Sequence, residues 1–218
     1  MTTPIKIVVL ISGNGSNLQA IIDEIKSGKL NAHITCVISN RADAGGLQRA
    51  TAANINTQVL DHKLFDSREA FDQALMEKID QAHPELVVLA GFMRILSDPF
   101  VKHYIGRMIN IHPSLLPKHQ GLNTHQRVLE AGETEHGATV HYVIPELDSG
   151  PIILQARVPV LANDDASQLA NRVREIEHKI YPESIRRIAT SQVTFSKGVV
   201  YYNQQPISVK QQQFNLSQ

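Results

Sequence analysis

The sequence predicts an α/β fold in which a mostly parallel, twisted β-sheet is covered by helices on both faces. Short apolar runs rich in β-branched residues alternate with segments of helical period, which is the pattern of repeated strand–helix–strand units. The chain has 218 residues, enough for one such domain with a sizeable buried core. Neither an internal repeat nor a linker interrupts the pattern, so we expect a single domain over residues 1–218.

The predicted elements follow one another along the chain. Strands are expected at 5–11, 34–39, 57–60, 85–90 and 108–111, and helices at 17–26, 46–53 and 68–82. The third helix carries Phe71, Leu75 and Ile79 on one face, the stripe of a helix packed on a sheet. From about residue 136 the pattern changes to strands at 138–144 and 152–160, a long helix over 166–189 interrupted near Pro182, and a last strand at 199–202.

Composition excludes several classes of protein. Lys+Arg and Asp+Glu both number 21, so the chain lacks the basic excess of nucleic-acid-binding proteins and no nucleic-acid partner is expected. Cys36 is the only cysteine; it excludes an internal disulfide, and its apolar neighbours predict a buried thiol suited to the reducing cytoplasm. No apolar stretch approaches the ~18 residues of a membrane span, so we expect neither membrane insertion nor export.

A glycine-containing loop, Ser12-Gly-Asn-Gly-Ser-Asn17, separates the first strand from the first helix. Backbone N–H groups at such a helix start form an anion site. A dinucleotide fingerprint would need glycine in place of Leu18 and an acidic residue within Ser39–Arg41, and no Lys-Ser/Thr pair follows the glycines as in a P-loop. The loop is therefore either an ordinary turn in which Ser16 or Asn17 caps the helix, or a pocket for a small phosphorylated ligand.

The segment INIHPSLLP places a polar pair at the end of the fifth strand. Alternate residues of a strand share a face, so Asn110 and His112 should project together where the chain leaves the sheet, which is where α/β sheets bind ligands. An amide and a protonated imidazole suit stabilisation of an oxyanion at an acyl carbon. Asp148, in a glycine-bounded turn, is the candidate partner of the histidine. The alternative is a hydrogen-bonded histidine with a purely structural role.

Other chemistries receive little support. The sequence has no Gly-x-Ser-x-Gly elbow, and its remaining histidines show no metal-ligand spacing. These are His33, His62, His83, His103, His119, His125, His136, His141 and His178. Since no protein nucleophile is evident, acyl transfer would need an attacking group from the substrate, and a free amine with a pKa of roughly 8 can attack unaided near neutral pH.

Taken together, five motifs resemble the phosphoribosylglycinamide formyltransferase family of folate-dependent enzymes. VVLISGNGSNLQAI, LAGFMRILS, INIHPSLLP, HGATVH and ELDSGP occur in family order and spacing, over residues 5 to about 190. The resemblance implies a Rossmann-like formyltransferase fold and transfer of the formyl group of 10-formyltetrahydrofolate to the amine of 5′-phosphoribosylglycinamide in purine (IMP) biosynthesis. It divides the chain into a substrate-phosphate half at about 1–100, a folate and catalytic half at about 101–190, and a tail at about 191–218.

The resemblance also implies roles for individual residues. The backbone of Gly15, Ser16 and Asn17 would hold the substrate phosphate, and Arg68 and Glu177 would bind the same substrate. The folate would contact Met93, Arg94, Ile95 and Leu96 in one segment and Ile144, Pro145, Glu146 and Leu147 in another. Pro145 stands where relatives are expected to carry a polar residue, and it has no N–H to donate, so one backbone contact to the pterin is in doubt.

The implied mechanism is direct attack of the substrate amine on the formyl carbon. Asn110 and protonated His112 would stabilise the oxyanion, and Asp148 would sustain the charge of His112 and organise proton transfer to the folate nitrogen. No metal is required. The predicted catalytic set is therefore Asn110, His112 and Asp148.

Several alternatives share these motifs. Other 10-formyltetrahydrofolate-dependent formyltransferases, acting on methionyl-tRNA or on a sugar-nucleotide amine, and formyltetrahydrofolate hydrolase use the same catalytic set. Neutral charge and the SGNGSN loop favour the phosphoribosyl substrate. A phosphometabolite-binding protein without turnover is the alternative from another class. The chain is expected to be a monomer or a homodimer, and the sequence does not decide whether the tail reaches the site.

Overall fold

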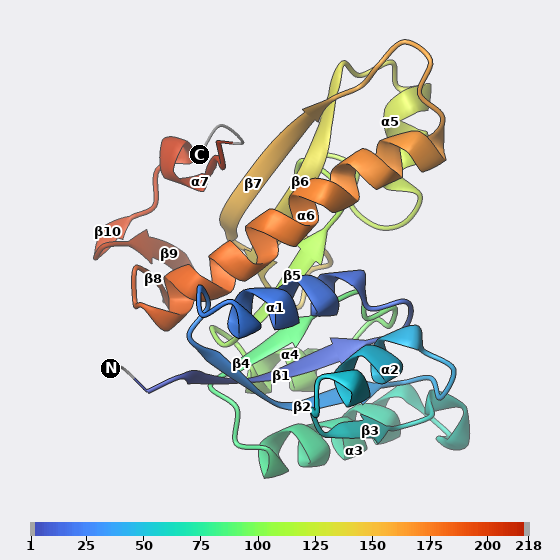
Figure 1. Cartoon of the computed structure of the whole chain (residues 1–218), viewed down its shortest axis with the longest axis vertical. Helices are drawn as coiled ribbons and strands as arrows, with labels where there is room; N and C mark the ends of the chain where they lie inside the picture. Colours follow the sequence, from blue (N-terminus) through green and yellow to red (C-terminus); the bar gives the residue numbers. More distant parts are fainter. Residues whose placement is uncertain (1–2, 216–218) are drawn as a thin grey trace. The chain divides into compact units, whose positions relative to one another are not determined.

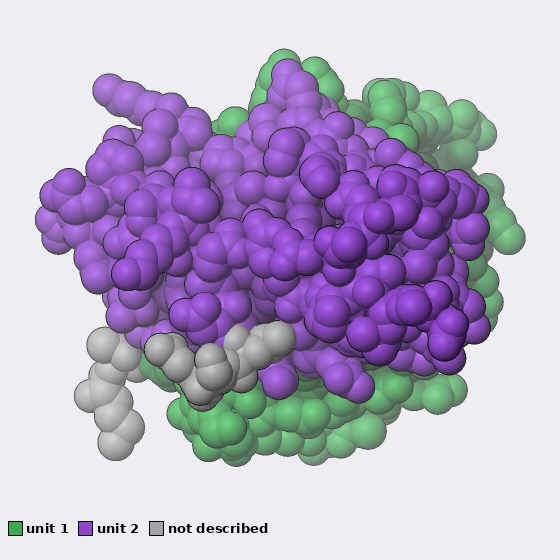
Figure 2. Space-filling model, turned by 90° about the horizontal axis from the view of Figure 1, so that it is seen from above, with its two compact units in different colours: residues 1–110 green, residues 111–218 purple. Residues whose placement is uncertain are grey.

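The computed structural model describes residues 3–215. The chain divides into two compact units, Met1–Asn110 and Ile111–Gln218, which are coloured separately in Figure 2. Along the chain the strands are β1 (Ile5–Ile11), β2 (Ala32–Ser39), β3 (Thr57–Val59), β4 (Leu86–Leu89), β5 (Met108–His112), β6 (Glu135–Tyr142) and β7 (Ile152–Pro159). Their order in the sheet is β3-β2-β1-β4-β5-β6-β7. Strand β1 pairs parallel with β2 and β4, β2 with β3, and β4 with β5, whereas β6 and β7 pair antiparallel, so the predicted mostly parallel α/β sheet is confirmed.

The first unit is built from parallel crossover connections. Its helices are α1 (Ser16–Lys26), α2 (Gly45–Ala52), α3 (Arg68–Gln81) and α4 (Asp98–His103), with a 3₁₀ turn at His62–Leu64 (Figure 1). Since such crossovers are right-handed, the chain places α1 and α2 on one face, and α3 and α4 on the other after it reverses direction between β3 and β4. Contacts join α1 to α2 and α3 to α4.

The core of this unit follows from its strand sequences. In β1 every side chain from Ile7 to Ile11 is fully buried, as expected for a central parallel strand covered on both faces. The stripe Phe71, Leu75 and Ile79 of α3 is also fully buried, and Cys36 is a buried free thiol, as the sequence predicts. The reversal of strand order lies between β1 and β4, so ligands are expected where these two strands end.

The second unit combines the β6–β7 hairpin with helices α5 (Thr124–Glu130) and α6 (Ala166–Ala189). The tail forms a small antiparallel sheet of β8 (Val193–Ser196), β9 (Val199–Tyr202) and β10 (Gln205–Pro206), followed by α7 (Val209–Gln212). Helix α6 packs on both β6 and β7, and α7 packs on β7. Within residues 3–215, no helix combines the length and the apolar character that crossing a membrane requires.

The predicted interruption of the long helix near Pro182 is wrong. Helix α6 runs unbroken from Ala166 to Ala189 with Pro182 inside it. Pro182 lies among buried neighbours that include Tyr181 and Ile185, and the helix starts with a complete capping box between Asp165 and Gln168. Packing and capping therefore offset the backbone hydrogen bond that proline removes.

Other differences concern short elements and strand ends. Helices α4 and α5, strands β8 and β10 and helix α7 were not anticipated from periodicity, because a few residues carry too little periodic signal. Strand β6 begins and ends earlier than expected, since its first residues pair with β7 from Glu135 onwards.

Candidate active site

The glycine loop leads directly into α1. Gly15 is the N-cap residue, with φ +76°, and no side chain caps the helix, so the expected alternative of capping by Ser16 or Asn17 is not observed. The first N–H groups of a helix have no intrahelical acceptor and attract anions. The loop therefore leads to a helix start whose backbone N–H groups are not capped by a side chain.

Two groups from α2 fix the other side of this loop. Gly46 N–H donates to the Gly13 carbonyl at 3.0 Å, and Arg49 donates to the carbonyl and the side-chain oxygen of Asn14 at 2.8 and 3.0 Å. The approach is so close that a Cβ on Gly15 would lie 2.5 Å from Gly46 Cα. Sequence reasoning missed Gly46 and Arg49. They lie more than 25 residues after the loop, and nothing in the local sequence indicates that they pack against it.

Ser12 connects this loop to the segment that follows β4. Its hydroxyl donates to Asn40 Oδ1 at 2.6 Å and accepts from Met93 N–H at 2.8 Å, and its own N–H donates to the Gly91 carbonyl at 3.2 Å. Ser12 and Asn40 are both buried. The hydroxyl therefore holds two predicted binding segments of the first unit together, a role that the sequence alone did not reveal.

The predicted folate segment after β4 presents apolar side chains to solvent. Met93 and Ile95 are 66% and 63% exposed, whereas the Arg94 guanidinium lies 4.6 Å from the centre of the Phe71 ring. Exposed apolar side chains at a strand end suit a flat, partly apolar ligand. Arg68, the first residue of α3, is exposed and lies 3.3 Å from Glu69.

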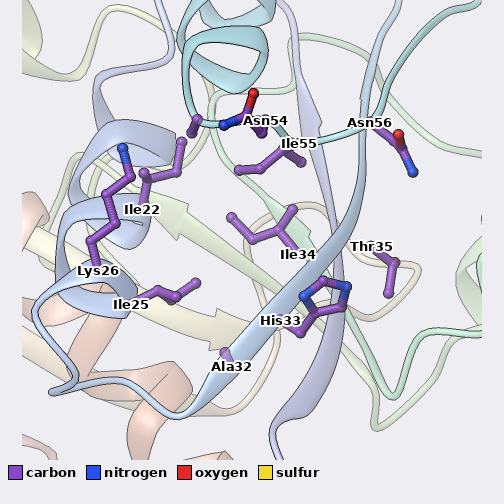
Figure 3. A pocket seen from close by; sticks show the side chains of 11 residues that line it. Ile22, Ile25, Lys26, Ala32, His33, Ile34, Thr35, Asn54, Ile55 and Asn56 are labelled. Atoms are coloured by element: carbon purple, nitrogen blue, oxygen red, sulfur yellow. The ribbon is translucent and has the colours of Figure 1, made fainter.

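A cavity of about 240 Å³ also lies in the first unit, away from these segments. It is lined by residues of α1, by Ala32–Thr35 of β2 and by residues 53–56 (Figure 3). These β2 residues begin the strand, whereas the glycine loop follows the end of β1. None of the residues predicted from the sequence as site residues lines this cavity.

The histidine and the aspartate that the sequence could not bring together are neighbours in the second unit. His112 Nδ1 lies 3.4 Å from Asp148 Oδ2, and both side chains are 8% exposed. His112 Nε2 lies 3.0 Å from the backbone carbonyl of His119. Because a carbonyl oxygen only accepts, Nε2 is the donor there, and Nδ1 is the ring nitrogen that faces the Asp148 carboxylate.

Asn110 lies two residues before His112 in β5 and shares its face of the strand, as predicted. It is half-buried, whereas Ile109 and Ile111 on either side are buried. An amide and an imidazole are thus presented from one strand end, on a backbone that the sheet makes rigid.

The turn that carries Asp148 has a backbone conformation that few residue types can adopt. Asp148 has φ +49°, a conformation that Asp and Asn tolerate better than most residues. Gly121 N–H donates to Asp148 Oδ2 at 2.9 Å. At Gly150 a Cβ would overlap the carbonyl oxygen of Tyr142. The Leu-Asp-Ser-Gly sequence is therefore what allows the carboxylate to reach the histidine.

A second histidine adjoins the same carboxylate. His141 Nε2 lies 3.9 Å from Asp148 Oδ1, and its Nδ1 donates to the Tyr142 carbonyl at 2.9 Å. Burial lowers the pKa of His141, so this ring is neutral. Sequence reasoning had grouped His141 with the other histidines; its place in the HGATVH motif was the signal that could have singled it out.

The remaining predicted residues of the second unit lie in two places. Ile144–Leu147 directly precede Asp148, and Leu147 is 55% exposed. Glu177 lies in the middle of α6 and is 9% exposed. A glutamate this buried needs compensating partners. Over residues 3–215, no group of three or more His, Cys, Asp or Glu side chains has an arrangement that could hold a metal ion.

Comparison with known proteins shows the family of the chain. The profile of the formyl transferase family matches residues 5–185. Phosphoribosylglycinamide formyltransferase of Escherichia coli K12 is 54% identical over 199 residues, which make up 91% of this chain and 94% of that protein. The bovine trifunctional purine biosynthetic protein adenosine-3 is 50% identical over 88% of this chain, which corresponds to 19% of the bovine protein.

Solved structures show the same likeness. Phosphoribosylglycinamide formyltransferase from Coxiella burnetii superposes with a TM-score of 0.93 at 52% identity, covering 97% of this chain and all of that one. Glycinamide ribonucleotide transformylase 1 from Symbiobacterium toebii superposes with a TM-score of 0.89 at 44% identity, covering 93% and 95% of the two chains. The chain therefore belongs to the formyl transferase family.

Proposed function

We propose that this chain transfers the formyl group of 10-formyltetrahydrofolate to the amine of 5′-phosphoribosylglycinamide, giving the N-formyl product and tetrahydrofolate in purine biosynthesis. The observation that carries the proposal is the buried pairing of His112 with Asp148 beside a strand-end asparagine. The relatives with high identity over most of both chains are phosphoribosylglycinamide formyltransferases by name.

The chemistry proceeds by direct attack. The neutral substrate amine attacks the formyl carbon and forms a tetrahedral intermediate with a negative oxygen. Asn110 donates its amide N–H to that oxygen, and the imidazolium of His112 stabilises its charge. Asp148 keeps His112 cationic and helps to move the amine proton to the folate nitrogen as the bond between the formyl carbon and that nitrogen breaks.

Substrate binding draws on the other segments. Gly15, Ser16 and Asn17 hold the substrate phosphate through backbone N–H groups, and Arg68 and Glu177 bind the phosphoribosylglycinamide. The folate packs on Met93–Leu96 and on Ile144–Leu147, where exposed Met93, Ile95 and Leu147 offer apolar surface. Pro145 has no N–H to donate to the pterin. We expect this to remove one backbone hydrogen bond to the folate and to leave the chemistry intact.

We also propose that the chain works in the cytoplasm, as a monomer or a homodimer, on small-molecule substrates and without a nucleic-acid partner. Zero formal net charge and the single buried thiol of Cys36 support this setting.

A spectrophotometric assay of folate deformylation, with each substrate omitted in turn, tests the proposal. Deformylation that requires both 10-formyltetrahydrofolate and phosphoribosylglycinamide is the expected result. Deformylation without the amine would assign a hydrolase instead. A ligand-dependent rise in melting temperature without turnover would assign a binding protein.

A further inference from the structure

One loop of the second unit contacts both members of the His112–Asp148 pair. The His119 carbonyl accepts from His112 Nε2 at 3.0 Å. Gly121 N–H donates to Asp148 Oδ2 at 2.9 Å, and that oxygen is the one that faces His112 Nδ1. Two backbone groups, two residues apart, therefore hold the imidazole from one side and the carboxylate from the other.

Glu133 ties this loop to the rest of the unit. His119 Nε2 lies 2.8 Å from Glu133 Oε1, and Lys118 Nζ donates to Oε2 at 2.9 Å. Hydrogen bonds from Lys118 and His119 hold the pKa of Glu133 below its ordinary value, so it is a carboxylate at neutral pH. The Glu133 backbone N–H donates to the Val128 carbonyl of α5 at 3.2 Å, which connects this carboxylate to a helix.

The contact between His119 and Glu133 is largely shielded from water. The His119 and Glu133 side chains are only 13% and 23% exposed, whereas Lys118 is 64% exposed. His119 is therefore held at both ends, with its side chain on Glu133 and its carbonyl on His112. A further anchor comes from Arg127, which donates to the Gln120 carbonyl.

We propose that His119 and Glu133 are positioning residues for the reaction: through the His119 carbonyl and the Gly121 N–H, their contact fixes the orientation of His112 and Asp148. The inference rests on the proposed function. Hydrogen bonds to the charged form of a group favour that form, and a displacement of about 1 Å at reacting groups can cost roughly 100-fold in rate. Because the pair reaches His112 and Asp148 only through backbone groups that orient them, we expect its loss to appear in turnover.

Steady-state kinetics of Glu133→Ala, His119→Ala and the double variant test the inference. We expect each single variant to lower kcat by about 10-fold or more while KM for both substrates changes by less than about 2-fold. The double variant should lose no more than either single variant, because the two side chains act through one contact. Glu133→Gln keeps an oxygen that can accept from His119, so it should recover part of kcat. If Glu133→Ala folds poorly, Glu133→Gln takes its place in the test.

Glu135→Ala is the matched control. Glu135, the first residue of β6, lies two residues after Glu133 and pairs with Arg157 at 2.9 Å. It should keep wild-type kcat. A wild-type kcat in Glu133→Ala would overturn the inference, and so would a loss of kcat in the double variant equal to the product of the two single losses. The proposed function would still stand in either case if the wild-type enzyme is active.

A measurement that needs no turnover separates the two proposals. The ¹⁵N signals of the His112 ring report the hydrogen bonds of both nitrogens. We expect them to move in Glu133→Ala and to stay in place in Glu135→Ala. Unchanged signals in Glu133→Ala would overturn the inference even if the wild-type chain showed no transferase activity.

Discussion

Asp148 Oδ2 lies 3.4 Å from His112 Nδ1, and water reaches only 8% of either side chain. Electrostatic attraction is stronger in such a shielded position than in water. The other carboxylate oxygen faces His141 at 3.9 Å, but burial lowers the pKa of His141 and keeps it neutral. Of the two rings beside Asp148, His112 therefore makes the closer contact with the carboxylate.

Replacing Asp148 by asparagine should separate chemistry from folding. Asparagine tolerates the φ of +49° at this position and can still accept from Gly121 N–H, but it carries no charge. For Asp148→Asn we expect kcat to fall by about 10²–10³-fold, the scale of losing one preorganised catalytic interaction. Steady-state kinetics measure the loss, and thermal unfolding should show a melting temperature near that of the wild type.

The control for this substitution is Asp98→Asn, which removes a charge from the exposed pair with Lys102. Its kcat should equal the wild-type value. Near-normal turnover in Asp148→Asn would remove Asp148 from the mechanism.

The glycine loop permits a matched pair of substitutions. A Cβ on Gly15 would lie 2.5 Å from Gly46 Cα, at φ +76°, whereas a Cβ on Gly13 would meet nothing within 4 Å. We expect Gly15→Ala to lower the free energy of unfolding by about 1–3 kcal/mol, through strain and overpacking, and to raise KM for phosphoribosylglycinamide. Urea unfolding and steady-state kinetics measure the two effects.

Gly13→Ala should leave stability close to the wild type. Equal KM values in the two variants would count against a phosphate site at the start of α1, because only Gly15→Ala disturbs the N-cap backbone.

The parts of the fold that the sequence predicted are those with local signals. The β1 run is fully buried from Ile7 to Ile11, and its apolar β-branched sequence alone indicates a central strand. Proline is also a local signal, and it misled at Pro182 because burial against the sheet overrides the preference of one residue. Helices as short as α4 carry too few periodic residues to be seen.

The geometry of the candidate site depends on contacts between distant segments. The turn sequence points to Asp148, but only the folded hairpin brings its carboxylate beside His112. Ser12 and Glu133 each connect two segments through hydrogen bonds, and nothing in the sequence around either residue assigns it that role. Motifs thus identify groups that react, whereas the residues that orient them become visible only in three dimensions.

The pair formed by half-buried His125 and buried His136 predicts a pH dependence of stability. Their nearest ring nitrogens lie 3.0 Å apart, and burial lowers the pKa of His136 from 6.5 to about 4. Between these two pKa values the unfolded chain binds a proton that the folded chain does not, so stability is full above about pH 6.5 and falls as the pH drops towards 4. The pKa of His125 is lowered in the same direction, again chiefly by burial.

Urea unfolding at pH 7.5 and pH 5 measures this loss, for which we expect His136 to contribute on the order of 1–2 kcal/mol. His136→Gln cannot bind a proton, so the difference between the two pH values should shrink in that variant. An unchanged difference would assign the acid sensitivity to other groups.

The C-terminal segment should stabilise the fold without taking part in the reaction. It lies along β7, the last strand of the sheet, where Phe214 N–H donates to the Gln155 carbonyl at 2.7 Å. Gln155 in turn donates to the Leu116 carbonyl at 2.8 Å. An uncovered edge strand is a site of aggregation, so removing residues 209–218 should lower the melting temperature and increase light scattering on heating.

A substitution that keeps the chain length sharpens this prediction. Phe214→Pro removes the N–H that donates to Gln155, whereas Phe214→Ala keeps it. We therefore expect the proline variant to be the less stable of the two, by roughly 1–2 kcal/mol for a lost backbone hydrogen bond and its unpaired carbonyl, with kcat and KM unchanged in both. A loss of turnover at unaltered stability would instead show that the tail acts on the site, through Gln155 and the loop that contains Leu116.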